Sequence, residues 1–177
     1  MAEIAGLKLI TPSSVAGSGV SLSGAKVVFT AATSVSVNGV FDGTHDNYLL
    51  VMRATISTGQ PNFRLRAAGS DATGNNCAFQ HLNADSTTVS GVRLSSVDFI
   101  NIGINGSSIG AGAHVYVYGP ALAQPTALRS VTAGTDSSAR ILDSAGTHSA
   151  STSYDGFTLS RTTGNMTGAL TVYGLSQ

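Results

Sequence analysis

Glutamate and lysine are almost missing from this chain, and that shortage limits its fold more than any other feature. Its 177 residues include one glutamate, Glu3, and two lysines, Lys8 and Lys26. Both residue types are staples of solvent-facing helix surfaces, so amphipathic helices are not expected. Serine, threonine and glycine are abundant instead, which suits exposed strand faces and turns. Because the hydrophobic share of 42% is ample for a core, the composition predicts a folded, all-β protein.

Short alternating segments separated by turn residues recur along the chain from Lys26 onward. In the last pair, apolar residues alternate on either side of a Gly164-Asn165 turn, as half-buried strands require. Strands of this number and length predict a two-sheet antiparallel sandwich that is jelly-roll-like. The predicted strands are Lys26–Thr30, Val35–Phe41, Asn47–Ser57, Asn62–Ala68, Cys77–Leu82, Val89–Leu94, Asp98–Ile104, His114–Tyr118, Ala127–Thr132, Ala139–Leu142, Phe157–Arg161 and Gly168–Tyr173.

The N-terminal residues 1–24 are predicted to form an extended arm, and residues 25–177 the sandwich domain. The apolar part of the arm ends at Pro12, and a Ser/Gly-rich linker follows over residues 13–24. An apolar arm on a flexible linker either adds a strand to its own domain or docks onto another subunit or a larger assembly. The sequence leaves both options open. The candidate attachment or oligomer residues are Ile4, Leu7, Leu9 and Ile10.

Charge and targeting features limit the classes of partner. Nine basic and nine acidic side chains cancel, and the basic stripe that nucleic-acid binding needs is missing from the sequence. Arg64 and Arg66 are predicted to share a solvated strand face, with a glycan or phosphate contact as the alternative. Cys77 is the only cysteine, so a buried, inert thiol is predicted. Neither a secretory signal nor a membrane-length apolar run is found, which predicts folding in a cytoplasm without membrane insertion.

Metal and cofactor sites are not predicted. The four histidines, His45, His81, His114 and His148, are far apart in the sequence, whereas a metal site favours close pairs. The polar run 42–47 could offer oxygen ligands to calcium, but an Asp-Gly turn and an Asx-capped strand start explain the same residues. The turn is the favoured interpretation.

Catalysis is not predicted either. The sequence holds no Gly-x-Ser-x-Gly nucleophile elbow, and its single glutamate leaves only aspartates for a glycosidase carboxylate pair. Asp98 is the one acid inside an apolar strand, where an outward-facing or capping role is predicted. The aromatic residues that could stack on a sugar are tyrosines, for which packing is the favoured role: Tyr48, Tyr116, Tyr118, Tyr154 and Tyr173.

Several segments in order resemble bacteriophage virion proteins of the tail-fibre, minor tail and head-decoration type. The resemblance covers about residues 26 to 175. It implies a non-enzymatic β-sandwich component on the virion exterior, made in the host cytoplasm and contacting other virion proteins and copies of itself, with a trimer expected. The matching segments are Val35–Phe41, Asp46–Val51, Phe63–Asp71, Val115–Ala121, Ser151–Phe157, Gly164–Gly168 and Val172–Gly174.

Two further roles remain open at the sequence level. Adhesion to a host-surface glycan would add to the structural role, and a carbohydrate-binding module unconnected with a virion is the alternative to it. Apolar side chains at positions predicted to face outward, such as Val92 and Ile109, could be subunit contacts.

Overall fold

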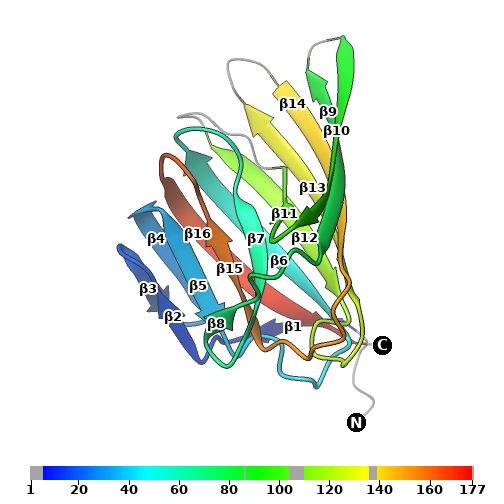
Figure 1. Ribbon diagram of the computed structural model, residues 1–177. Coiled ribbons are helices and arrows are strands. Elements are labelled where there is room, and N and C mark those ends of the chain that lie inside the picture. The colour runs from blue at the N-terminus through cyan, green and yellow to red at the C-terminus, as the bar shows by residue number, and fades with distance from the viewer. Residues whose placement is uncertain (1–5, 86, 104–109, 136–138, 177) are drawn as a thin grey trace.

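The computed structural model describes residues 6–85, 87–103, 110–135 and 139–176, and its regular structure there is entirely strand. Every strand pairing among these residues is antiparallel, and the strands form two sheets packed face to face (Figure 1). The predicted all-β sandwich is therefore confirmed. Among the described residues, no helix has the length and apolarity to cross a bilayer.

The larger sheet, sheet A, has ten strands. Its order is β10-β9-β14-β13-β12-β6-β16-β4-β3, and β1 also pairs with β16. Its strands are β1 (Leu7–Ile10), β3 (Val20–Ser23), β4 (Lys26–Ala32), β6 (Asn47–Ile56), β9 (Cys77–Asp85), β10 (Thr88–Val97), β12 (Ala111–Tyr118), β13 (Thr126–Thr135), β14 (Ala139–His148) and β16 (Met166–Leu175).

The smaller sheet, sheet B, has six strands in the order β11-β7-β15-β5-β2, with β8 paired to β7. Its strands are β2 (Ser14–Ala16), β5 (Ser34–Asn38), β7 (Asn62–Ala67), β8 (Ser70–Asp71), β11 (Ile100–Asn101) and β15 (Gly156–Ser160). Every strand range predicted from the sequence overlaps one of the observed strands. The strand predicted at 98–104 shrinks to the two residues of β11, and Ile104 lies outside the described residues.

The core lies between the sheets and is centred on aromatic rings. Phe63 of β7 and Phe157 of β15 stack with ring centroids 5.2 Å apart, and Phe41 touches both Phe157 and Tyr48. Tyr48 projects from the central strand β6 of sheet A and is fully buried. Aromatic packing of this kind between alternating inward positions is what holds two sheets together.

The N-terminal segment is part of the sandwich, which corrects one prediction. Leu7–Ile10 adds a strand to its own domain by pairing with Val172–Leu175 of β16, one of the two options left open. Residues 13–24 do not form a flexible linker, because β2 pairs with β5 in sheet B and β3 pairs with β4 in sheet A. Glycines provide the sharp turns between these strands: Gly17, Gly19 and Gly24 all have positive φ.

Sheet A extends beyond sheet B at one side. We call the four strands β9, β10, β13 and β14 the wing; in Figure 1 the tips of β9, β10 and β14 rise above the rest of the sandwich. Part of the inner side of the wing is covered by the segment around β11. There the carbonyl of Ile102 accepts a hydrogen bond from Ser130 at 2.7 Å, and that of Asn101 accepts one from Ser144 at 2.8 Å. The opposite side of the wing has no second layer among the described residues.

Candidate interaction surface

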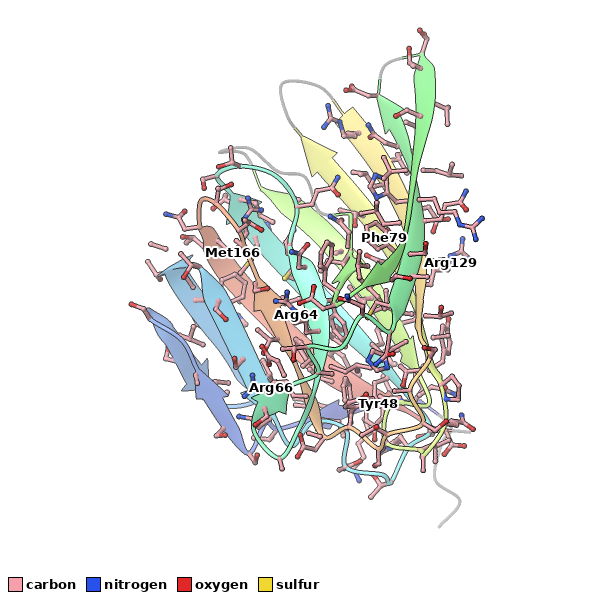
Figure 2. The ribbon with its side chains drawn as sticks, in the orientation of Figure 1. Tyr48, Arg64, Arg66, Phe79, Arg129 and Met166 are labelled. Carbon is pink, nitrogen blue, oxygen red and sulfur yellow. The ribbon has the colours of Figure 1, made fainter. Side chains whose placement is uncertain are left out.

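The outer face of sheet A, turned away from sheet B, carries apolar side chains where a solvated sheet normally carries polar ones. The residues on this outer face can be identified from the alternation along β12. There Ala111, Ala113, Val115 and Val117 are buried, and the residues between them face outward. Register then assigns the outward positions of each neighbouring strand, because directly opposed residues share a face. Arg129 lies on this face, and Figure 2 shows its side chain pointing away from the sandwich.

Four exposed apolar side chains gather on the outer face of the wing, and we call them the wing patch. Leu82, Val89, Val131 and Ile141 are 51%, 68%, 42% and 62% exposed. Val131 lies opposite Asp143, which lies opposite Leu82, so these three form one row across β13, β14 and β9. In the next row Ala84 lies opposite both Ile141 and Val89. The patch is thus continuous over four adjacent strands.

One exposed ion pair enters the wing patch, because its carboxylate, Asp143, lies between Val131 and Leu82. Arg129 donates to Asp143 from Nη2 at 2.6 Å and from Nε at 3.1 Å. The hydrogen bond to Asp143 raises the pKa of Arg129 above its ordinary value. Because both side chains are well exposed, the pair adds little to stability and instead places charge within the apolar surface.

A shallow groove lies beside the patch, between β6, β12 and β13. It has a volume of about 400 Å³ and is lined by Val51, Gly112, His114, Val131 and Ala133 among others. The absence of a side chain at Gly112 and the small one at Ala133 leave this depression between larger neighbours. An apolar patch next to a groove of this shape is suited to contact with a protein surface.

The predicted attachment residues differ in exposure in the structure. Leu7 and Leu9 are 56% and 51% exposed and lie opposite Leu175 and Tyr173 on the outer face of sheet A. Ile10 is 6% exposed and belongs to the core, so its assignment as a contact residue is wrong: alternation along β1 turns it inward. Ile4 lies outside the described residues.

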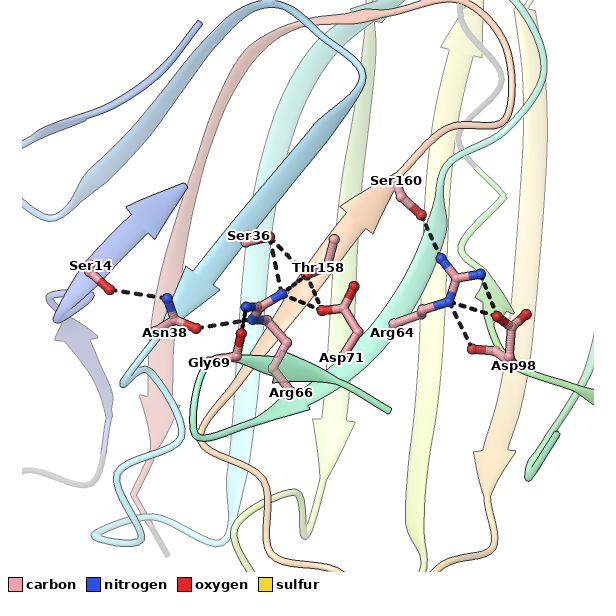
Figure 3. Close-up of polar contacts among 10 residues, drawn as sticks. All are labelled: Ser14, Ser36, Asn38, Arg64, Arg66, Gly69, Asp71, Asp98, Thr158 and Ser160. Carbon is pink, nitrogen blue, oxygen red and sulfur yellow. Dashed lines mark hydrogen bonds and ion pairs between the residues drawn. The ribbon is translucent and has the colours of Figure 1, made fainter. Parts of the chain in front are cut away.

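Arg64 and Arg66 share the outer face of sheet B as predicted, but they are not freely solvated, and that part of the prediction is wrong. Arg64 bonds Asp98 and Ser160, and Arg66 forms an ion pair with Asp71. Arg66 also bonds other groups of β5, β15 and the turn before β8, as Figure 3 shows: Ser36, Asn38, Gly69 and Thr158. Their donors are thus used within the protein, which favours a stabilising role over a ligand contact.

The polar run 42–47 forms the predicted turn. Asp42 Oδ1 accepts hydrogen bonds from the Thr44 amide at 3.0 Å, the Thr44 hydroxyl at 2.8 Å and the Tyr48 hydroxyl at 3.1 Å. Burial alone would raise the pKa of Asp42, but the hydrogen bonds from Thr44 and Tyr48 outweigh it and lower the pKa. This is the geometry of an Asx turn at a strand start. Within the described ranges, no three His, Cys, Asp or Glu side chains converge as metal ligands would.

The remaining candidates are divided between core and surface. Cys77 is buried as predicted, and burial raises its thiol pKa to about 11. Tyr48 and Tyr154 are buried, which confirms the packing role predicted for them. Tyr116 and Tyr118, however, stack on the outer face of β12 with ring centroids 6.3 Å apart and an interplanar angle of 9°.

Sequence reasoning missed the wing patch because each of its residues looks like an ordinary strand residue. The available signal was the adjacent pair Ile141 and Leu142, since two consecutive apolar residues in a strand cannot both face one core. Searches against protein-family models, curated proteins and solved structures find no match for this chain.

Proposed function

We propose that this protein is a non-enzymatic structural component of a bacteriophage virion exterior, of the tail-fibre, minor tail or head-decoration type. In this proposal the outer face of sheet A contacts neighbouring virion proteins and other copies of the chain. The support is the resemblance of residues 26 to 175 to such proteins, together with an exposed surface suited to assembly.

The wing patch is the observation that carries the proposal. Isolated exposed apolar residues are normal, but a continuous set on neighbouring strands marks a surface that another molecule covers. Val89 and Ile141 are 68% and 62% exposed, more than any other large apolar residue in the described chain. Leu7 and Leu9 of β1 are two further exposed leucines, and they also lie on the outer face of sheet A.

Particle association tests the proposal directly. Lysates of the producing host are fractionated by density, and an antibody to the chain is used to locate it and to label particles for electron microscopy. We expect the chain in the particle fraction, with label at the head surface or on the tail. Recovery of the chain only as free protein, or clearing of host cell wall by the purified chain, would contradict the proposal.

A paired substitution then tests the face. Leu82→Thr with Ile141→Thr removes two apolar contacts while keeping good strand formers. We expect this variant to fold but to leave the particle fraction. Leu22→Thr is the matched control, because Leu22 is an exposed leucine of β3 at the other edge of sheet A.

A carbohydrate-binding role is the second candidate, and the stacked pair Tyr116 and Tyr118 favours it. Parallel, partly exposed rings offer a flat apolar surface on which a sugar ring can pack. A glycan array probed with the purified chain tests this role. Binding that is lost in Tyr118→Ala would support it, and an array without binding would set it aside.

A further inference from the structure

Strand β10 is the longest open edge in the described structure. Among the described strands it pairs only with β9, so one of its two sides faces no other strand. Nine of its ten residues, Thr88–Ser96, are exposed. Figure 1 shows the strand standing at the outer limit of the wing. The backbone groups on an open edge are donors and acceptors ready to bind a further strand.

The devices that normally protect such an edge are sparse here. Natural edge strands carry lysine, proline, inward charges or bulges that prevent pairing. Between Thr88 and Ser95 the only charged residue is Arg93, and there is no proline or lysine. A bulge occurs, but it lies at the far end, where the register shifts between Ser95 and Val97 and Ser96 has φ of 56°. The preceding eight residues keep an unbroken register with β9, and Arg93 is the one charge among them.

The length of β10 indicates what covers it. The other strands of sheet A with an open side are β1 and β3, with four residues each, and those of sheet B are β2, β8 and β11, with three, two and two. The described chain therefore offers one edge that can match ten residues, and that edge is β10 itself. We propose that two copies of this protein associate by pairing β10 with β10 in antiparallel orientation about a two-fold axis.

Charge and side-chain alternation select the register. A two-fold axis perpendicular to the sheet keeps faces aligned, so the central residue lies opposite its own copy. An axis at Arg93 would oppose two like charges, which destabilises a strand pair. An axis at Val92 instead places Arg93 opposite Gly91 of the second copy, where space is greatest, and Leu94 opposite Ser90. We therefore place the axis at Val92.

This pairing would cover apolar surface as well as backbone. Val92 and Leu94 are 45% and 43% exposed and lie opposite His81 and Phe79, on the inner face of the wing. Pairing across the axis brings Val92 against Val92 of the second copy and Leu94 against Ser90 of the second copy. It also joins the wing patches of the two copies into one larger outer face. The dimer does not depend on the virion role, since it would form in the purified protein.

Sedimentation of the purified chain is the first test. We expect a concentration-dependent monomer–dimer equilibrium in the micromolar range. Val92→Lys places two like charges at the axis and should raise the dimer dissociation constant at least about tenfold. Leu22→Lys, on the β3 edge, is the matched control and should leave the dimer intact. A monomeric wild type, a trimer, or a dimer that Val92→Lys leaves unchanged would overturn the proposal.

Disulfide trapping is the second test and does not rely on a disruptive variant. Directly opposed residues of antiparallel strands have Cα atoms about 4.5–5.5 Å apart, within the range that a disulfide spans. Val92→Cys should therefore form a covalent dimer on mild oxidation, whereas Leu22→Cys and the wild type should not. Native Cys77 is buried and does not compete. Failure of Val92→Cys to cross-link while folded would reject this register, and failure of Gly91→Cys as well would reject the register whose axis lies at Gly91; a monomer in sedimentation rejects the pairing itself. Particle association without dimers would leave the proposed function standing and remove this inference alone.

Discussion

Arg64 and Asp98 form a two-pronged ion pair in which both hydrogen bonds reach one carboxylate oxygen. Nη2 of Arg64 donates to Asp98 Oδ2 at 2.6 Å and Nε donates to the same atom at 3.1 Å. Asp98 lies in the connection from β10 of sheet A to β11 of sheet B, and Arg64 lies on β7 of sheet B. The pair therefore fixes the point where the chain leaves the wing and crosses to the other sheet.

Removal of Asp98 should destabilise the fold. The Arg64 and Asp98 side chains are 22% and 30% exposed, so Asp98→Ala leaves a largely buried guanidinium without its partner. We expect the free energy of unfolding to fall by about 1–3 kcal/mol, measured by urea titration. Asp143→Ala is the control, because its pair with Arg129 is solvent-exposed, and it should cause no measurable change. Equal effects of the two substitutions would contradict the structural role of Asp98.

Gly168 should tolerate no side chain. A Cβ at this position of β16 would lie 2.2 Å from the Arg53 carbonyl oxygen and 2.6 Å from Ala54 Cα on β6. Gly168→Ala therefore has to push two central strands apart, and we expect a loss of at least about 2 kcal/mol of unfolding free energy. Gly112→Ala is the matched control on β12, since its nearest atom would be 3.9 Å away. If Gly168→Ala melted at the same temperature as the control, β16 and β6 would not approach each other as closely at Gly168 as these distances require.

Stability should fall at acidic pH because two histidines are buried. Burial lowers the pKa of both His81 and His148 below 6.5. His148 packs edge-on against Tyr154 and lies opposite Cys77 on β9. Since the folded pKa lies below the unfolded one, the unfolded chain binds more protons, so stability present above pH 6.5 is lost as the pH falls toward the folded pKa.

The substitution His148→Gln should weaken this dependence of stability on pH. Adding His81→Gln to the same variant should weaken the dependence further. Urea unfolding at several pH values between 7.5 and 5 measures the effect. His114→Gln, at an exposed position of β12, is the control and should leave the pH profile unchanged. A wild-type profile that is flat over this interval would contradict the prediction.

The thiol of Cys77 should be inert in the folded protein. Its pKa is raised to about 11 by burial, and the nearby Asp98 adds to the effect. Because the thiolate is the reactive form, alkylation at neutral pH should be negligible until the chain unfolds. Mass spectrometry after iodoacetamide treatment, with and without urea, measures this. Rapid labelling of the native protein would show that β9 opens easily at this position.

The strands could be predicted from sequence because their signals are local. Alternation and turn residues located the strands from β4 to β16 except the two-residue β8, since period-two patterns and turn glycines at positive φ act over a few residues. β2 and β3 were missed because Ser14, Val15 and Ser21 resemble a linker, and only pairing with β5 and β4 orders them. The buried hydroxyls of Ser130 and Ser144 were equally unpredictable, since their acceptors are the carbonyls of Ile102 and Asn101.

The candidate surface was predictable only in part. Val92 was predicted to face outward; it is exposed but lies opposite His81 on the inner face of the wing, whereas Ile109 lies outside the described residues. Leu7 and Leu9 were predicted as contacts and lie exposed, although whether they bind a partner stays a prediction. Arg64 and Arg66 were misjudged because their partners Asp98 and Asp71 come from other segments.

The sequence alone determined that this chain forms antiparallel strands, because composition and alternation restrict each segment regardless of its neighbours. It did not determine which side of each strand would be covered. Ile141 and Leu142 are adjacent and equally apolar, yet they are 62% and 1% exposed. Alternation requires only that they face opposite ways. The tertiary structure decided the rest, because the segment around β11 covers part of one side of the wing and no described segment covers the other.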